Sequence, residues 1–283
     1  MSAVRMDGKA LSAKVRGSIL AETEELKKKG VTPGLAVIIV GNDPASEIYV
    51  RNKEKACAEC GFYSEKYALP AETSQEELLG LIDQLNKSPQ ISGILCQMPV
   101  PDHISEQAVI DAIDPKKDVD AFHPVNVGKI MVGNFDFVPC TPAGVMELLD
   151  EYGIDPKGKA CVVVGRSNIV GKPMSMLLLH RHGTVTICHS RTQNLSEVCR
   201  RADILVAAVG KAGFITPDMV KDGAVVIDVG INRNAEGKVC GDVDPAVMEK
   251  ASYMTPVPGG AGPMTITMLM KNTLKAAKIQ NGL

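Results

Sequence analysis

Segment 161–179, CVVVGRSNIVGKPMSMLLL, combines an apolar run, a glycine-containing turn and an apolar helical pattern, in that order. This order predicts a buried strand followed directly by a helix, and the turn between two such elements commonly binds a nucleotide phosphate. The dinucleotide fingerprint G-x-G-x-x-G needs three glycines. This chain supplies Gly165 but has Ser167 and Val170 at the other two positions, with a glycine one residue later and Arg166 inside the turn. Such an incomplete fingerprint is equally compatible with a phosphate loop and with an ordinary strand-to-helix turn.

The next predicted strand favours the phosphate loop and indicates which cofactor it binds. It ends in VTICHSRT (185–192), where an NAD site usually has an acidic residue for the ribose hydroxyls, and no acidic residue is present. The additional phosphate of NADP suits a site with Arg166 and Ser190 as donors and Arg191 as a further donor. The sequence therefore predicts NADP as the cofactor.

Composition excludes several classes of partner. The chain has 283 residues, 45% of them hydrophobic, with a net charge of −2 and a pI of about 6.2. With no basic field and no apolar run near the ~20 residues of a membrane span, we expect neither nucleic acid nor a membrane as partner. The N-terminus has no signal-type apolar stretch, so a cytoplasmic protein is expected.

The eight cysteines lack the spacing of a disulfide framework. In a reducing compartment most of them are expected to be small buried residues. Cys57 and Cys60 form a C-x-x-C pair, but the pair lies inside a helical pattern and no second ligand pair accompanies it. We expect core packing for this pair, and no metal site.

Strands and helices alternate in both halves, which predicts an α/β fold with a parallel sheet. We place a boundary near residue 140, giving a domain at 1–140 and a Rossmann-like domain at 141–262, with the last helix, 263–283, returning to the first. The expected strands are 34–41, 62–68, one within 91–101 that runs into a proline-stiffened loop, 160–164, 184–188, 203–209 and 224–229. Helices are expected at 7–29, 44–61, 139–153 and 263–278. A further helix is expected to begin with the capping-box pair Ser74 and Glu77, and three others are expected to begin near residues 171, 194 and 216.

Three polar residues of the first half are candidates for chemistry. Tyr49 and Lys53 are four residues apart on one predicted helix and so share a face, although spacing alone favours a surface lysine on an amphipathic helix. Gln97, in CQMPVP, follows a predicted strand at its carboxyl end, where open α/β sheets bind ligands. This placement favours a site over a solvated helix face.

Two loops add further candidates. KKDVDAFHP (116–124) places Asp118 and Asp120 outside any regular element, and His123 there is more typical of a helix entry than of a catalyst. Pro258–Pro263, PGGAGP, forms a stiffened glycine loop before the last helix, which suits an anion or the close approach of a ligand.

Taken together, seven stretches resemble the bifunctional methylenetetrahydrofolate dehydrogenase/methenyltetrahydrofolate cyclohydrolase family: YVRNK, GILCQMPVP, DVDAFHP, VPCTP, VVVGRSNIVGKPM, CHSRT and PVPGGAGPMT. They occur in the family's order across nearly the whole chain. The departures are small. Ala121 stands where the family commonly has glycine, Ala261 where it has valine, and Met98 and Val100 where leucines are commoner.

The resemblance implies two α/β domains around a cleft, a homodimer, NADP as cofactor and tetrahydrofolate derivatives as substrates. It implies that Lys53 is the essential lysine, assisted by Tyr49 and Gln97, and that Asp120 anchors the pterin ring. It also implies that NADP contacts Gly165, Arg166, Ser167, Ser190 and Ile231, and that the folate site is lined by Pro258, Gly259, Gly260, Ala261 and Gly262.

The implied chemistry explains these residue types. Hydride transfer from methylenetetrahydrofolate to NADP⁺ releases no proton and so depends on positioning. Hydrolysis of the methenyl product to 10-formyltetrahydrofolate moves protons, and Lys53 is the candidate shuttle. An ordinary lysine, with a pKa near ~10.4, is almost fully charged at neutral pH, so this role requires the pKa of Lys53 to be lowered.

Three alternatives stay open. One is a monofunctional dehydrogenase of the same fold, and another is a non-catalytic NADP-binding protein, in which loss of Lys53 or Asp120 would be expected. The third is an amino-acid-type dehydrogenase. This last class would be expected to have a carboxylate-binding arginine in the first half, where the chain offers only Arg5, Arg16 and Arg51.

Overall fold

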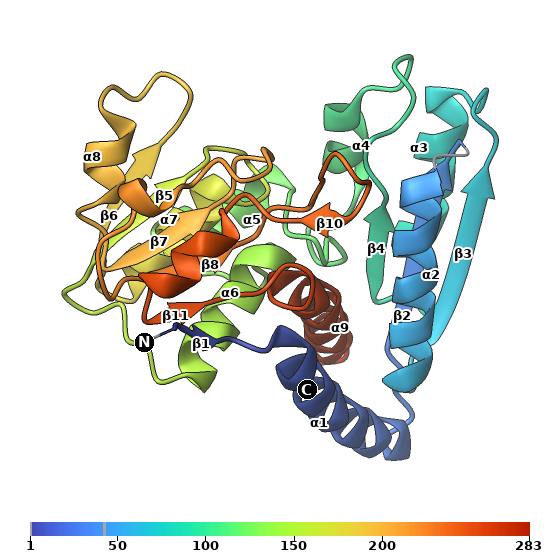
Figure 1. Cartoon of the computed structure of the whole chain (residues 1–283). Helices are drawn as coiled ribbons and strands as arrows, with labels where there is room; N and C mark the ends of the chain where they lie inside the picture. The colour runs from blue at the N-terminus through green and yellow to red at the C-terminus, as the bar shows by residue number, and fades with distance from the viewer. Residues whose placement is uncertain (1, 42–43) are drawn as a thin grey trace. The chain divides into compact units, whose positions relative to one another are not determined.

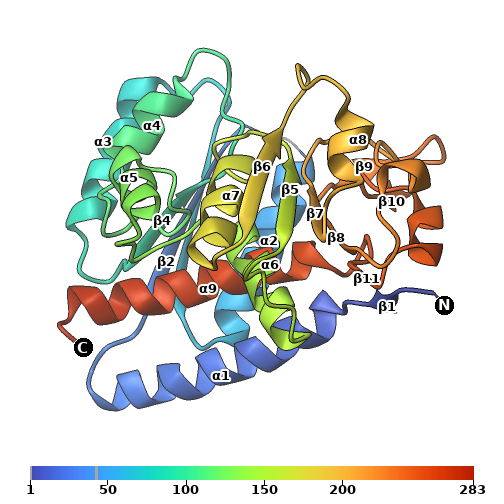
Figure 2. The same ribbon diagram turned by 90° about the vertical axis from the view of Figure 1, so that its left-hand side faces the viewer.

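The computed structural model describes residues 2–41 and 44–283, and of residues 44–49 it describes the backbone alone. Figures 1 and 2 show its helices and strands. The strands are β1 (Val4–Arg5), β2 (Gly34–Val40), β3 (Tyr63–Leu69), β4 (Gly93–Cys96), β5 (Ala160–Val164), β6 (Thr184–Cys188), β7 (Ile204–Ala207), β8 (Val225–Asp228), β9 (Asn232–Arg233), β10 (Val239–Cys240) and β11 (Tyr253–Met254). The α-helices are α1 (Gly8–Lys28), α2 (Pro44–Glu59), α3 (Gln75–Lys87), α4 (Glu106–Ala112), α5 (Pro124–Val132), α6 (Cys140–Glu151), α7 (Gly171–His180), α8 (Leu195–Cys199) and α9 (Ala261–Gln280). Two short 3-10 helices are η1 (Pro217–Met219) and η2 (Pro245–Glu249).

The chain divides into two compact units. One comprises Lys14–Cys140 and Ile266–Leu283, and the other comprises the segment up to Ala13 together with Thr141–Thr265. Below they are called the lysine unit, which contains Lys53, and the glycine-loop unit, which contains Gly165.

The lysine unit is built on the three-stranded parallel sheet β3-β2-β4. All seven residues of β2 are buried, as a continuous apolar run predicts for a central parallel strand. Helix α2 packs against β2 and β3 (Figure 1), whereas α3 packs against β4 and α4. Helix α3 begins with the predicted capping box, in which Ser74 and Glu77 each bond the other's backbone N–H, and it buries Leu78, Ile82 and Leu85.

The glycine-loop unit contains a six-stranded parallel sheet in the order β1-β11-β8-β7-β5-β6. Helix α7 packs against β5 and β6 (Figure 2) and buries Met174 and Leu178. A second cluster of buried side chains from β5, β7, β8 and η2 includes Val164, Leu205, Val226 and Val247. Because β5, β6, β7 and β8 are parallel, their carboxyl ends lie at the same edge of the sheet, and the loops that follow them lie at that edge.

The structure differs from the sequence expectation at four places. Residues up to Ala13 belong to the glycine-loop unit, because β1 pairs with β11, a pairing 249 residues apart in sequence that no local pattern reveals. The helix expected near 216 is only the 3-10 turn η1. The β9–β10 hairpin and helix α4 were not predicted.

The two-domain α/β fold class with a parallel sheet is confirmed. In the part of the chain that the structure describes, no helix is both long enough and apolar enough to cross a membrane.

Candidate functional site

Lys53 and Gln97 meet at the carboxyl end of β4. The strand runs fully buried to Cys96, and the Gln97 N–H continues the ladder by donating to the Ile38 carbonyl at 2.8 Å. Lys53, on α2, donates from Nζ to Gln97 Oε1 at 2.8 Å, and Gln97 Nε2 donates to the Met98 carbonyl at 2.8 Å. The amide thus fixes the lysine amine without adding a charge.

The segment carrying Asp120 runs alongside β4. Ile94 and Asp118 form a parallel bridge, and the Ile94 N–H donates to the Lys117 carbonyl at 2.8 Å. Continuing this register by two residues brings Asp120 beside the end of β4, at the Lys53–Gln97 pair. Gly93 permits the close approach, because a Cβ at this position would lie 2.6 Å from Val119 Cγ1.

Asp118 holds the loop after this bridge rather than facing a ligand. Its carboxylate is buried and accepts hydrogen bonds from Asn126 Nδ2 at 2.8 Å and from the His123 N–H at 2.9 Å. His123 caps α5 by accepting from the Val125 N–H at 3.1 Å, which confirms the predicted helix entry. Ala121, fully buried, adopts φ +59°, a conformation that favours glycine.

Two residues that the sequence interpretation did not single out support Asp120. Asn272, on α9, donates from Nδ2 to the Val119 carbonyl at 2.8 Å and to the Val138 carbonyl at 2.9 Å. The Cys140 thiol contacts the Val119 carbonyl at 3.6 Å and Asp120 Oδ1 at 3.8 Å. Asn272 is buried on a helix whose apolar pattern gives no reason for an amide, and this mismatch was the available signal.

Burial shifts both ionisable groups of the site toward their uncharged forms. Desolvation lowers the pKa of Lys53 below its ordinary 10.5, and the opposing effect of the Asp120 carboxylate is smaller. Desolvation also raises the pKa of Asp120 to about 6, against the smaller lowering by Lys53. The thiol of Cys96, whose pKa burial raises to about 12, adds no charge at neutral pH. The Lys53 amine is therefore more easily uncharged than that of an ordinary lysine, as a proton acceptor requires.

Replacing Asp120 by asparagine is expected to stabilise the protein at high pH only. Since the folded pKa of Asp120, about 6, exceeds the ordinary 3.8, the folded state binds more protons between these values and stability falls as pH rises through them. The asparagine amide would resemble the protonated acid at every pH. Because the side chain is only half-buried, solvent screening limits the gain in unfolding free energy at pH 8 to on the order of 1 kcal/mol. Denaturant unfolding at pH 8 and pH 4 measures it.

The gain should vanish at pH 4, and Asp102→Asn, which removes a carboxylate from an exposed position, is the matched control. An Asp120→Asn variant no more stable than the parent at pH 8, or equally stabilised at both pH values, would contradict the raised pKa of Asp120.

The turn after β5 is a tight glycine cradle. Gly165 has φ +144°, and a Cβ there would overlap the Ala208 carbonyl oxygen and lie 3.0 Å from its carbon. A Cβ at Gly171 would overlap the Gly165 carbonyl oxygen. Ser167 Oγ accepts from the Val170 and Gly171 N–H groups at 3.2 and 3.3 Å, and a hydroxyl that accepts hydrogen bonds can also donate one, for example to an anion.

The other predicted cofactor residues lie in the same unit, with exposed side chains. Arg166, Ser190 and Arg191 are exposed in the loops after β5 and β6. Ile231, after β8, is 54% exposed, and its Cδ1 would lie 3.9 Å from a Cβ at Gly262. All of these loops follow the carboxyl ends of parallel strands, the edge at which open α/β sheets bind ligands.

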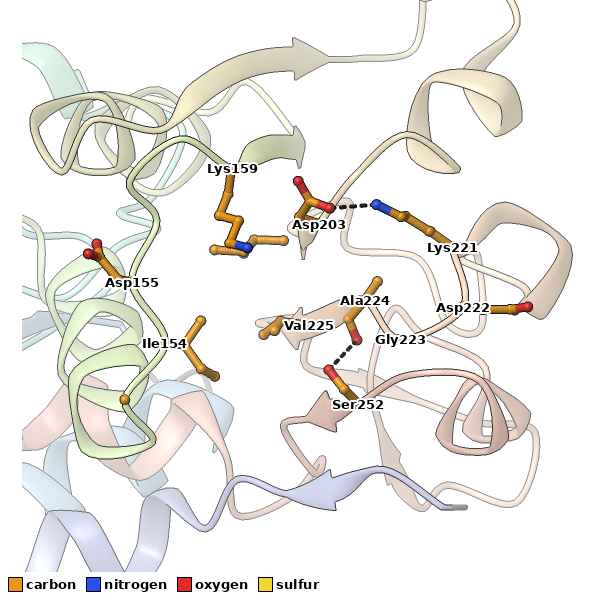
Figure 3. A pocket seen from close by; sticks show the side chains of 12 residues that line it. Ile154, Asp155, Lys159, Asp203, Lys221, Asp222, Gly223, Ala224, Val225 and Ser252 are labelled. Atoms are coloured by element: carbon orange, nitrogen blue, oxygen red, sulfur yellow. Dashed lines mark hydrogen bonds and ion pairs between the residues drawn. The ribbon is translucent and has the colours of Figure 1, made fainter.

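A cavity of about 360 Å³ lies at the opposite edge of the same sheet (Figure 3). Its lining residues Lys159, Asp203 and Ala224 directly precede β5, β7 and β8. Asp203 pairs with Lys221 at 2.6 Å. This amino-terminal edge is not where a parallel sheet binds a nucleotide, and the cavity contains no predicted site residue.

The predicted site residues divide between the two units. Pro258–Gly262 belongs to the glycine-loop unit, where Gly259 has φ +107° and its carbonyl accepts from the Lys9 N–H at 3.1 Å. Lys53, Gln97 and Asp120 belong to the lysine unit. Tyr49 lies on α2, but its side chain is outside the described residues. Cys57 and Cys60 are fully buried, as expected of core residues.

Known proteins match the chain over its length. The family model described as the tetrahydrofolate dehydrogenase/cyclohydrolase catalytic domain matches residues 6–120, and that of the family's NAD(P)-binding domain matches residues 139–281. The chain is 65% identical, over 281 residues and 99% of each chain, to the bifunctional protein FolD of Acetivibrio thermocellus.

Solved structures of the same family superpose on the chain. The bifunctional FolD methylenetetrahydrofolate dehydrogenase/cyclohydrolase of Campylobacter jejuni superposes with a TM-score of 0.96 at 50% identity, covering 99% of this chain and 100% of its own. The Trypanosoma brucei enzyme, solved with NADP cofactor and inhibitor, superposes with a TM-score of 0.95 at 40% identity, covering 100% of both chains. The resemblance inferred from the seven stretches is confirmed: the chain belongs to the tetrahydrofolate dehydrogenase/cyclohydrolase family.

Proposed function

We propose that the chain catalyses two successive reactions of one-carbon metabolism. The first is NADP-dependent oxidation of 5,10-methylenetetrahydrofolate to the 5,10-methenyl compound, and the second is hydrolysis of that compound to 10-formyltetrahydrofolate. The observation that carries the proposal is the Lys53 amine, held by Gln97 at the end of β4 with a lowered pKa. A monofunctional dehydrogenase would not require such an amine, because hydride transfer releases no proton.

We assign folate chemistry to the lysine unit, with Tyr49, Lys53, Gln97 and Asp120 as its catalytic and substrate-binding residues. The carboxylate of Asp120 would accept hydrogen bonds from the donor edge of the pterin, and the ring of Tyr49 would stack on the ligand. The glycine-loop unit would contribute Pro258, Gly259, Gly260, Ala261 and Gly262 to the folate site.

The glycine cradle after β5 fits NADP. Glycine is needed at positions 165 and 171 because a Cβ at either would overlap backbone. Arg166, Ser190 and Arg191 would bind the additional phosphate, while Gly165, Ser167 and Ile231 would contact the rest of the cofactor. When bound, NADP⁺ accepts the hydride from the one-carbon bridge. The protein's contribution to that step is to hold the two reacting carbons together.

Lys53 acts in the hydrolysis. Water adds to the carbon of the amidinium cation, and its released proton passes to the Lys53 amine. The bond from that carbon to one ring nitrogen then breaks, and the hydroxyl proton of the adduct ends on the departing nitrogen. One proton leaves overall, and the amine returns to its uncharged form when it releases that proton to solvent.

A coupled assay tests the proposal and separates the alternatives. The protein is mixed with tetrahydrofolate, formaldehyde and each nicotinamide in turn, while reduced cofactor and methenyl absorbance are recorded together. We expect NADPH to form and the methenyl compound to disappear faster than it hydrolyses spontaneously. A monofunctional dehydrogenase would accumulate the methenyl compound, and a non-catalytic NADP-binding protein would form no NADPH.

Arg166→Gln is expected to raise the KM for NADP about 10- to 100-fold while changing the KM for NAD little. A charge-assisted hydrogen bond contributes about 1.5–3 kcal/mol, and only NADP carries the phosphate that receives it. Initial-rate kinetics with both cofactors measure the effect. Arg181→Gln, which removes an arginine paired with Asp150 at the far end of α7, is the matched control. Parallel changes in both KM values would refute the assignment of Arg166.

We further propose a cytoplasmic homodimer. Strand β6 supports the dimer, because it is an outer strand of the sheet with Thr184, Thr186 and Ile187 exposed, and an unpaired edge of this kind is a surface that pairs with another chain. All eight cysteines are free thiols, which fits a reducing compartment. Sedimentation of the purified protein as a monomer at micromolar concentration would refute the dimer.

A further inference from the structure

Asp242 is a fully buried carboxylate that joins two loops of the glycine-loop unit. Its Oδ2 accepts from the Val209 and Gly210 N–H groups at 2.6 and 3.0 Å. Its Oδ1 accepts from the Lys211 N–H at 2.9 Å and from Asn232 Nδ2 at 2.8 Å. The Asp242 side chain therefore holds three consecutive residues of one loop, 209–211, and the Asn232 side chain of a second loop.

Both loops lie at the edge of the sheet that carries the glycine cradle. Residues 209–211 follow β7, and 229–232 follow β8, its neighbour in the sheet (Figure 1). Ala208, which begins the first loop, is the residue whose carbonyl borders Gly165. Ile231 precedes Asn232 in the second loop. The Asp242 carboxylate thus connects the 209–211 loop, which lies next to Gly165, with the loop that contains Ile231.

A second buried carboxylate holds Asp242 in place. Asp228 Oδ1 accepts from the Asp242 and Gly230 N–H groups, each at 2.9 Å, and its Oδ2 accepts from the Val243 N–H at 2.9 Å. A Cβ at Gly230 would overlap Asp242 Cγ, and a Cβ at Gly241 would overlap Asp228 Oδ2. The carboxylates and glycines therefore fit together without space for a larger side chain.

We propose that Asp242 is a positioning residue for the nicotinamide cofactor, which holds the 209–211 loop and the Ile231 loop at the spacing that a bound dinucleotide requires. The inference rests on the proposed NADP site. Among the described residues the Asp242 carboxylate is hydrogen-bonded to the two loops, so we infer that it acts through them and does not itself touch the cofactor.

Asp242→Asn tests the inference, because an amide would direct its N–H₂ group at backbone N–H donors and push one loop away. We expect the KM for NADP to rise about tenfold and dehydrogenase kcat to fall, since a misplaced ring loses the reacting geometry. Cyclohydrolase activity on added methenyltetrahydrofolate, assigned to the lysine unit, should stay within about twofold. Asp244→Asn is the matched control, because the Asp244 carboxylate, two residues away, caps η2. We expect this variant to leave both the KM for NADP and the dehydrogenase kcat unchanged.

Ile231→Ala separates failure of the inference from failure of the proposed site. If Ile231→Ala leaves the KM for NADP unchanged, the proposed cofactor site is wrong and the inference fails with it. If Ile231→Ala raises that KM but Asp242→Asn changes neither constant, the site stands and the positioning role is wrong. Should Asp242→Asn not fold, Asn232→Ala decides: a raised KM for NADP supports the inference, and an unchanged KM overturns it.

Discussion

Lys53→Met is expected to abolish enzymatic hydrolysis of methenyltetrahydrofolate, lowering its kcat at least 10²- to 10⁴-fold, the usual contribution of a general acid–base group. Methionine keeps most of the side chain's length but has no proton to exchange. Dehydrogenase activity should fall much less, because hydride transfer needs positioning and no proton acceptor. The decay of methenyl absorbance, corrected for spontaneous hydrolysis, measures the loss.

Lys55→Met is the matched control on the same helix. Lys55 lies two residues from Lys53, its side chain is 76% exposed, and it forms a surface pair with Glu59 at 3.8 Å. This variant should retain both activities. Full cyclohydrolase turnover in Lys53→Met would remove Lys53 from the mechanism, and an equal loss of both activities would indicate that the lysine serves only to bind the substrate.

Gly165→Ala is expected to disable the dehydrogenase and to destabilise the glycine-loop unit. The new Cβ would overlap a backbone oxygen, so no side-chain rotation relieves the clash, and φ +144° is a conformation that alanine rarely adopts. We expect a loss of about 2–4 kcal/mol in unfolding free energy, together with a rise in the KM for NADP of at least about tenfold. Denaturant unfolding and NADP-dependent initial rates measure the two effects.

Gly158→Ala separates backbone strain from the clash. Gly158 lies in the same unit with φ +70°, and a Cβ there would meet nothing within 4 Å. The Gly158→Ala variant should lose only roughly 1 kcal/mol of unfolding free energy, the cost of an alanine in the left-handed conformation, and it should keep its affinity for NADP. Similar losses in the two variants would show that the space around Gly165 has no special role.

Much of the fold was predictable because its signals are local. The buried run of β2, the capping box of Ser74 and Glu77, and the strand–turn–helix around Gly165 each depend on residues close in sequence. The pairing of β1 with β11 depends on a contact across almost the whole chain, and each strand is only two residues long. The segment after Thr216 has an N-terminal proline, a helical start signal, but it forms only a 3-10 turn, because the backbone is already extended at Val220.

The site shows the same division. Gln97 was singled out by its place at the end of a strand and Lys53 mainly by the resemblance to the family, and the structure joins them across 44 residues. Asp242 and Asn272 were missed because most of their partners are backbone groups from distant segments. The signal available for Asp242 was the glycine beside each acid, in Asp228-Val229-Gly230 and Gly241-Asp242-Val243, since glycine leaves room for a buried carboxylate.

The most direct test of the central claim is an NMR titration of the Lys53 amine in the free protein, using lysine labelled at Cε and assigning the signal by its loss in Lys53→Met. Burial beside Gln97 predicts a pKa below the ordinary 10.5, and a still lower pKa in Asp120→Asn, because the carboxylate opposes the shift. A pKa at or above 10.5 would leave Lys53 charged throughout the neutral range, and it would contradict the proposed proton transfer.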